Sequence, residues 1–161
     1  MNQRTDRTVL GLISDTHGLL RPSVHSAFAG VHAILHAGDI GGADILDELA
    51  LIAPVRAVAG NTDDPGDPSL TPSLVARYDG VEIHVSHGHE LGSPTPAKLA
   101  AAYRHNVIVY GHTHRQLISR VGEQLVINPG AAGARRFNLS PSVALLFIES
   151  GKAEAEIVPI D

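Results

Sequence analysis

The sequence predicts an α/β fold: a four-layer α/β/β/α sandwich of two mixed β-sheets flanked by helices. In the first part of the chain, short apolar runs alternate with segments of helical periodicity, as in the βαβ units that build parallel sheets. The second part carries paired apolar runs that meet at short turns, Asp79-Gly80 and Gly122-Glu123, as in antiparallel hairpins. With 161 residues and neither a linker nor an internal repeat, residues 1–161 are expected to form one domain.

The elements of the first part follow from local patterns. Apolar runs at 8–14, 33–37 and 55–59 predict strands, each bounded by polar or glycine residues. Pro22 suits the first turn of a helix over 23–29, and the spacing of apolar residues over 43–51 predicts a second helix.

The remaining elements are read in the same way. The segment 62–72 is rich in Asp, Pro and Gly and is expected to be a loop. Strands are expected at 74–78 and 81–86, a helix at 96–103, and a strand at 107–110. Two antiparallel strands then meet at Gly122-Glu123, and a last pair covers 143–148 and 153–159.

Composition limits the kinds of function. No apolar run is long enough to span a membrane, and residues 1–7 are polar, as in a flexible tail and unlike a signal peptide. The absence of cysteine excludes disulfides and thiolate metal sites and suits a reducing cytoplasm, where the protein is expected. A formal net charge of −5 disfavours long nucleic acid as a partner.

Candidate metal ligands follow the predicted strands in one order along the chain. The motifs are Asp15-Thr16-His17, Gly38-Asp39, Gly60-Asn61, His87-Gly88 and Gly111-His112-Thr113-His114. Asp, Asn and His side chains bind pairs of divalent cations, and α/β folds bind ligands outside the carboxyl ends of strands. Residues two apart at the end of an extended strand point to the same side, so each Asp-x-His or His-x-His pair could bind one metal centre. The neighbouring glycines allow close approach of the backbone. The pattern predicts a two-metal hydrolase.

This order of motifs resembles the calcineurin-like metallophosphoesterase superfamily, and in particular its small single-domain phosphodiesterases. Three blocks are close matches to these phosphodiesterases: ISDTHG at 13–18 and HAGDI at 36–40, which include two of the motifs above, and Asn128-Pro129-Gly130. The resemblance extends from Val9 to about Ile148.

The resemblance implies a ligand set and a reaction. One metal would be held by Asp15, His17 and His114, and the other by Asn61, His87 and His112. Asp39 would bridge the two together with a hydroxide. The implied catalytic residues are Asp39, Asn61 and His112, and the hydroxide would attack a small phosphate diester in line. Manganese is the expected metal; iron, zinc, nickel and magnesium stay open.

The chain departs from the superfamily pattern at two positions. Larger members carry a histidine after the Gly-Asn pair that protonates the leaving group, and Thr62 stands there instead. Loss of such an acid costs about 10²–10⁴-fold in rate, which favours activated or cyclic esters. His89 could substitute if its loop turns inward. Ala131 replaces the serine that relatives commonly place after Asn-Pro-Gly.

Other polar residues are assigned by position. Arg115, Arg135 and Arg136 are candidates for binding the substrate phosphate, with Arg135 preferred to Arg136; solvated surface charge is the alternative. His36 and Asp63 are expected to support the ligands. Packing or surface roles are expected for the other four histidines, at positions 25, 32, 84 and 105.

Several functions stay open. A phosphomonoesterase fits the same residues almost as well as a phosphodiesterase. A retromer subunit uses this fold as a protein-interaction scaffold, but several of its ligand positions are degraded, whereas all are intact here. The pattern therefore favours an enzyme acting on a small phosphate ester, with the substrate and any homo-oligomer undetermined.

Overall fold

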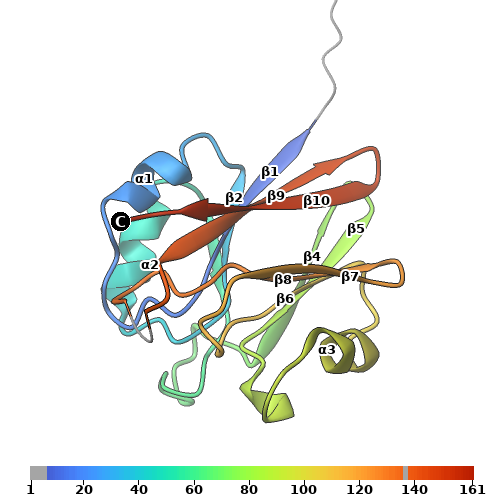
Figure 1. Ribbon diagram of the computed structural model, residues 1–161. Helices are drawn as coiled ribbons and strands as arrows, with labels where there is room; N and C mark the ends of the chain where they lie inside the picture. Colours follow the sequence, from blue (N-terminus) through green and yellow to red (C-terminus); the bar gives the residue numbers. More distant parts are fainter. Residues whose placement is uncertain (1–6, 136–137) are drawn as a thin grey trace, which may run out of the picture.

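The computed structural model describes residues 7–135 and 138–161, and it contains two five-stranded sheets with helices outside them (Figure 1). In chain order the elements are β1 (Thr8–Ile13), α1 (Ser23–Ala27), β2 (Ala33–His36), α2 (Ala43–Ala50), β3 (Val55–Ala57), β4 (Ser73–Tyr78), β5 (Val81–Ser86), η1 (His89–Leu91), α3 (Pro96–Ala102), β6 (Val107–Val109), β7 (Leu117–Val121), β8 (Gln124–Asn128), β9 (Ser142–Glu149) and β10 (Lys152–Pro159).

Both sheets are mixed. The first has the order β10-β9-β1-β2-β3, with β1, β2 and β3 parallel and β9 antiparallel to β1. The second has the order β4-β5-β6-β8-β7, with β5, β6 and β8 parallel and the two outer strands antiparallel. Each sheet therefore presents three adjacent carboxyl ends, and the loops that follow β1, β2, β3, β5 and β6 carry the candidate ligands.

Three apolar clusters hold the four layers together. Alternate residues of β1, Leu10 and Leu12, point into the interior between the two sheets, where they meet Val85 and Val107 from the second sheet. A second cluster joins the outer face of the first sheet to α1 and α2, and a third joins α3 to the second sheet. The four-layer architecture predicted from the sequence is confirmed.

The predicted elements agree with the structure to within a few residues at their ends. The segment 62–72 is a loop, with one isolated bridge between Val58 and Thr71. The short 3-10 turn His89–Leu91 was not predicted, because three residues are too few to show a periodicity. Of the tail predicted at 1–7, residues 1–6 lie outside the described residues, and Arg7 lies over the ring of Phe147, 4.3 Å from its centroid. Within the described ranges, no helix is both long and apolar enough to cross a membrane.

Packing roles account for the four remaining histidines. His84 is buried on β5 and stacks on Tyr103, with 3.8 Å between ring centroids, while the other three hydrogen-bond to nearby backbone or acidic groups. Burial, with a smaller contribution from the charge of His105, lowers the pKa of His84 to about 4.

His84 should make the fold acid-sensitive. The unfolded chain takes up a proton at His84 near pH 6.5, whereas the native protein does so only near pH 4. The free energy of unfolding should therefore fall as the pH drops through this window, by up to about 1.4 kcal/mol per pH unit. A His84→Phe variant, which keeps a stacking ring, should lose this contribution in urea unfolding between pH 4 and 7. His25→Phe, at an exposed site, should keep it, and parallel curves for wild type and His84→Phe would contradict the prediction.

Candidate metal centre

Backbone hydrogen bonds fasten the strand-end loops to one another. The Asp15 N–H donates to the Gly38 carbonyl and the Gly111 N–H to the His87 carbonyl, each at 3.0 Å, which joins neighbouring loops within each sheet. The His112 N–H donates to Asp15 Oδ2 at 3.2 Å and so joins the two sheets. The loops at the carboxyl ends of both sheets therefore meet at one site.

Asp15 lies at the centre of this site. Its Oδ2 atom accepts from the Ser14 hydroxyl as well as from His112, whereas its Oδ1 atom is buried without a hydrogen bond. Three imidazole Nε2 atoms approach Oδ1: His114 at 3.4 Å, His17 at 3.6 Å and His87 at 3.8 Å. Burial alone would raise the pKa of Asp15, but these histidines and Ser14 hold it well below its usual range. Asp15 is therefore an anion with one oxygen turned toward the Nε2 atoms of three histidines.

Asp39 is arranged in the same way. Its Oδ1 atom accepts from the Thr62 N–H at 2.9 Å, and its Oδ2 atom lies 3.2 Å from His87 Nε2 and 3.5 Å from His17 Nε2. Burial would raise the pKa of Asp39, yet the nearby His87 imidazole and the hydrogen bond from the Thr62 N–H lower it to about 2. Both carboxylates thus have one oxygen held by the protein and the other facing a shared space.

The tautomer of His87 is set by its surroundings. Its Nδ1 lies 2.9 Å from the Ala37 carbonyl, which can only accept, so Nδ1 carries the hydrogen. Nε2, buried and without a hydrogen bond, points at Asp15 and Asp39. Burial lowers the pKa of His87, but Asp39 and Asp15 outweigh it and the pKa is raised. An imidazole anchored through one nitrogen and open at the other is the usual form of a histidine metal ligand.

The candidate ligands fall into two groups that share Asp15. In each group of three, the ligand atoms lie within 4.8 Å of one another: one group is Asp15, His17 and His114, and the other is Asp15, Asp39 and His87. The His112 ring makes an edge contact with that of His87, 5.2 Å between centroids, beside the second group. Burial and the charge of His87 lower the pKa of His112, which favours the neutral imidazole that can bind a metal.

The remaining predicted residues lie at the margin. Asn61 is exposed, but its neighbours Gly60 and Thr62 both pack on Asp39, which places Asn61 at the edge of the site. Arg115 and Arg135 are also exposed. Arg136 lies outside the described residues.

Two residues expected to support the ligands do so. His36 Nδ1 accepts from the Gly38 N–H at 3.0 Å, so its Nε2–H donates to the Thr16 hydroxyl, also at 3.0 Å. Complete burial lowers the pKa of His36 to about 4 and keeps it in this neutral form. Asp63 accepts from four backbone N–H groups, those of residues 39, 40, 41 and 60, at 2.8–3.3 Å. The loops after β2 and β3 are therefore tied to one carboxylate.

Sequence reasoning missed two further supporting residues. The Asn128 amide donates to the Gly111 carbonyl and to the Thr113 hydroxyl, at 3.2 and 3.0 Å, and so fixes the turn that carries His112 and His114. Arg21 donates through Nε to the Gly133 carbonyl at 2.9 Å. Asn128 ends a buried strand, a position that could have indicated its role, but nothing near Arg21 in the sequence points to Gly133.

The backbone at the ligands is left-handed. Asp15, His17, Asp39, His112 and His114 all have positive φ, between 46° and 72°. Such values are uncommon outside glycine and concentrate at functional sites. The extended geometry assumed for residues two apart is therefore wrong here: His114 faces Asp15, whereas the His112 ring lies against His87.

Close approach explains why two positions in the motifs are glycine. A Cβ at Gly60 would lie 2.1 Å from Asp39 Oδ1, and one at Gly111 would lie 2.6 Å from Asp15 Oδ2 and 2.0 Å from Ser14 Oγ. Any side chain at either position would displace an aspartate of the centre. These glycines are needed by the opposing loop as much as by their own turns.

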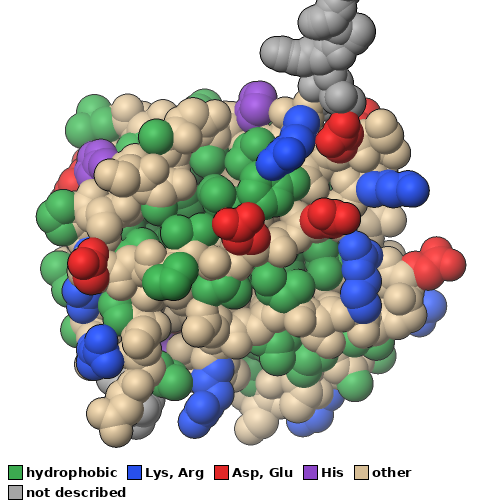
Figure 2. All heavy atoms as spheres, turned by 45° about the horizontal axis from the view of Figure 1, so that its top comes forward, with side chains coloured by type: hydrophobic (Ala, Val, Ile, Leu, Met, Phe, Trp, Pro, Cys, Tyr) green, Lys and Arg blue, Asp and Glu red, His purple; other side chains and the backbone are tan. Residues whose placement is uncertain are grey.

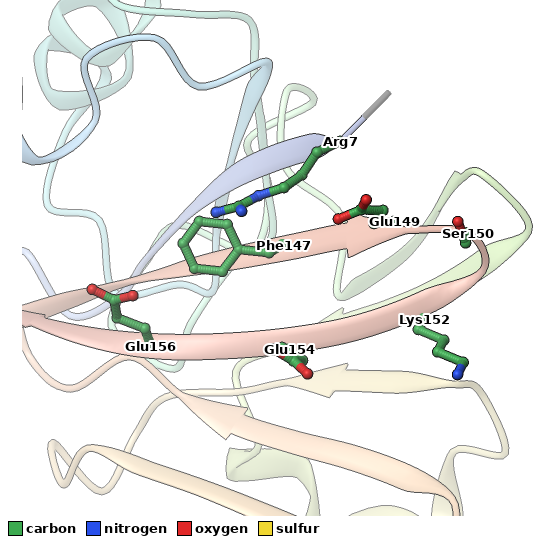
Figure 3. A pocket seen from close by; sticks show the side chains of 7 residues that line it. All are labelled: Arg7, Phe147, Glu149, Ser150, Lys152, Glu154 and Glu156. Atoms are coloured by element: carbon green, nitrogen blue, oxygen red, sulfur yellow. The ribbon is translucent and has the colours of Figure 1, made fainter. Parts of the chain in front are cut away.

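The surface also has a depression away from the candidate metal centre. It has a volume of about 470 Å³ and opens on the outer face of β9 and β10, lined by Arg7, Phe147, Ser150, Lys152 and three glutamates (Figure 3). None of the candidate ligands lines it. The face turned forward in Figure 2 mixes acidic, basic and apolar side chains without a continuous basic stripe.

The residues of the centre suit divalent cations. Buried Asp15 Oδ1, His17 Nε2 and His87 Nε2 have no hydrogen-bond partner within the protein, although buried polar atoms normally have one. Oxygen and imidazole nitrogen without sulfur is a ligand set for manganese, iron or zinc. A cation among these atoms would satisfy all three.

Comparison with known proteins identifies the family. The calcineurin-like phosphoesterase superfamily domain matches residues 9–151, so the chain belongs to this superfamily. A probable metallophosphoesterase of Methanothermobacter thermautotrophicus is 34% identical over 158 residues, which cover 93% of this chain and 91% of that protein. Phosphodiesterase MJ0936 of Methanocaldococcus jannaschii is 28% identical, covering 75% of this chain and 82% of the relative.

Solved structures agree on the fold. Wild-type Vps29 of Entamoeba histolytica, complexed with Zn²⁺, superposes with a TM-score of 0.75 at 25% identity, covering 96% of this chain and all of Vps29. The family resemblance inferred from the motifs is confirmed.

Proposed function

We propose that this protein is a dinuclear-metal-dependent phosphodiesterase that hydrolyses small phosphate diesters. The observation that carries the proposal is that the anionic Asp15 and Asp39 carboxylates lie close to three imidazoles. The Nε2 atoms of His17, His87 and His114 all approach Asp15 Oδ1. The relatives named as metallophosphoesterases and phosphodiesterases support the same reaction class.

Each residue has a defined part in this proposal. Asp15, His17 and His114 would hold one cation, and His87, His112 and Asn61 the other, with Asp39 between them. Two cations held there would lower the pKa of a water and neutralise phosphoryl oxygens. The exposed Asn61 amide can both accept and donate, so it can orient the phosphate at the mouth of the site. Arg115 and Arg135 are exposed and can pair with its outer oxygens.

Thr62, which stands where larger members of the superfamily carry a histidine, favours diesters with good leaving groups. Thr62 is used through its backbone N–H, which donates to Asp39, and a threonine hydroxyl does not titrate near neutral pH. Aryl and cyclic diesters, whose leaving oxygen needs little protonation, should therefore react faster than simple alkyl esters.

The proposal is tested by removing and restoring metal. Protein stripped with a chelator should not hydrolyse bis-p-nitrophenyl phosphate, and Mn²⁺ should restore turnover. Calorimetric titration should give two Mn²⁺ per chain, and the diester should be preferred to p-nitrophenyl phosphate. Faster cleavage of the monoester would favour a phosphomonoesterase.

The likeness to Vps29 favours a second candidate, a metal-binding protein-interaction scaffold of the same fold. The Vps29 structure itself contains Zn²⁺, so metal binding alone does not separate the two. Turnover does: stoichiometric metal binding without hydrolysis of either ester by any divalent cation would favour the scaffold.

A further inference from the structure

A second cavity, of about 270 Å³, opens beside the candidate metal centre. Gly60 and His89 form its border with the centre. Gly60 packs on Asp39, and the His89 ring lies 5.4 Å from that of His87 and 6.2 Å from that of His112, centroid to centroid. A phosphate held at the centre would therefore extend one of its ester substituents toward this cavity.

The walls of the cavity differ from a phosphate site. Pro65 and Leu70 supply apolar surface, and His89 and Tyr103 supply rings. Lysine and arginine are absent from the described residues that line it, so an anionic substituent would gain no charge partner there.

Glu90 gives the cavity a negative charge. Its Oε2 accepts from the Tyr103 hydroxyl at 2.6 Å and its Oε1 from the Gly88 N–H at 3.0 Å, which fixes the carboxylate in place. Burial would raise the pKa of Glu90, but the Tyr103 hydrogen bond helps to lower it, so the group is ionised at neutral pH. Among the described residues, His89 is the basic side chain next to this carboxylate, with 3.9 Å between His89 Nδ1 and Glu90 Oε1.

We propose that this cavity is a subsite for a cationic, amine-bearing substituent of the phosphodiester substrate. A carboxylate beside aromatic rings and apolar walls is the surrounding that attracts an organic ammonium group. This subsite rests on the proposed phosphodiesterase function, and it defines the class of ester that the enzyme prefers.

The test uses three diesters with the same leaving group, assayed with the Mn²⁺-loaded protein. They are p-nitrophenyl phosphocholine, its isostere with an uncharged substituent, p-nitrophenyl 3,3-dimethylbutyl phosphate, and methyl p-nitrophenyl phosphate. In each, water supplies the new oxygen on phosphorus while the bond to the nitrophenyl oxygen breaks, so the products are p-nitrophenol and the alkyl phosphate. We expect kcat/KM for the choline ester to exceed that of the isostere with the uncharged substituent by about 3- to 10-fold.

Two variants locate the effect. Glu90→Gln keeps groups that can pair with Tyr103 and Gly88 but removes the charge, and it should bring the ratio of choline to isostere close to one. Glu123→Gln, on an exposed turn, should leave the ratio unchanged. Ser73→Trp, which fills the cavity, should slow the choline ester but not the methyl ester, whereas Val75→Trp on the same strand should slow neither.

The methyl ester separates the two proposals. Turnover of the methyl ester with equal kcat/KM for the choline ester and its isostere would overturn the subsite while leaving the phosphodiesterase intact. An unchanged preference in Glu90→Gln would also overturn it. No turnover of any of the three would refute the phosphodiesterase function and the subsite together.

Discussion

Replacing Asp39 by asparagine is expected to lower kcat/KM for bis-p-nitrophenyl phosphate by about 10³-fold or more, because a charge between two cations is worth several kcal/mol. Asparagine keeps the shape of the side chain and can still accept from the Thr62 N–H. The fold should therefore survive, and the loss should come from the metal centre. Calorimetry should show fewer than two Mn²⁺ bound per chain.

A matched control separates this effect from general charge loss. Asp44→Asn removes an exposed carboxylate on α2 and should change neither activity nor metal stoichiometry. His112→Ala, at another of the three proposed catalytic positions, should lose activity as Asp39→Asn does. Full activity in Asp39→Asn would show that this residue does not lie between the metals.

Replacing Asp63 by alanine should produce the largest loss of stability. Its carboxylate accepts four backbone N–H groups from the loops after β2 and β3, and alanine leaves these donors without a partner. Each unsatisfied buried donor costs about 1–3 kcal/mol, and the Gly41 N–H is exposed, so a total of about 3–5 kcal/mol is expected from urea unfolding. Because Asp39 lies in one of these loops, Mn²⁺ affinity should also fall by about 10- to 100-fold.

Asp64→Ala is the control within the same loop. Among the described residues, the exposed Asp64 carboxylate accepts a hydrogen bond only from the Gly66 N–H, so its loss should cost less than about 1 kcal/mol. If Asp63→Ala does not fold, Asp63→Asn, which retains one acceptor oxygen, should show a smaller loss of both stability and Mn²⁺ affinity. Equal unfolding energies for Asp63→Ala and Asp64→Ala would contradict the anchoring role.

The fold could be predicted because its signals are local. Alternating apolar residues in β1 place Leu10 and Leu12 between the sheets, and Asp79-Gly80 specifies a tight turn between β4 and β5. The ligand motifs could be found for a related reason: each follows a strand, and parallel strands bring their carboxyl ends together. The ligand roles of Asp15 to His114, and the metals themselves, stay predictions that the Mn²⁺ experiments test.

Other features depend on contacts between residues far apart in the sequence. The predicted orientation of His112 and His114 failed because their left-handed backbone is held by Asn128 and by Asp15, which no local pattern reveals. The cavity that contains Glu90 is closed by residues from 59 to 103, and its charge matters only because Tyr103 and Gly88 hold the carboxylate there.

The sequence by itself determined the four layers, the order in which polar motifs follow the strands, and the family. These features depend on periodicity and on motif order. Only the tertiary structure decided which oxygen of each aspartate faces the histidines, which nitrogen of His87 is open, and where a second cavity adjoins the centre. Those features are set by hydrogen bonds between loops of two sheets, and such bonds exist only after the sheets have packed.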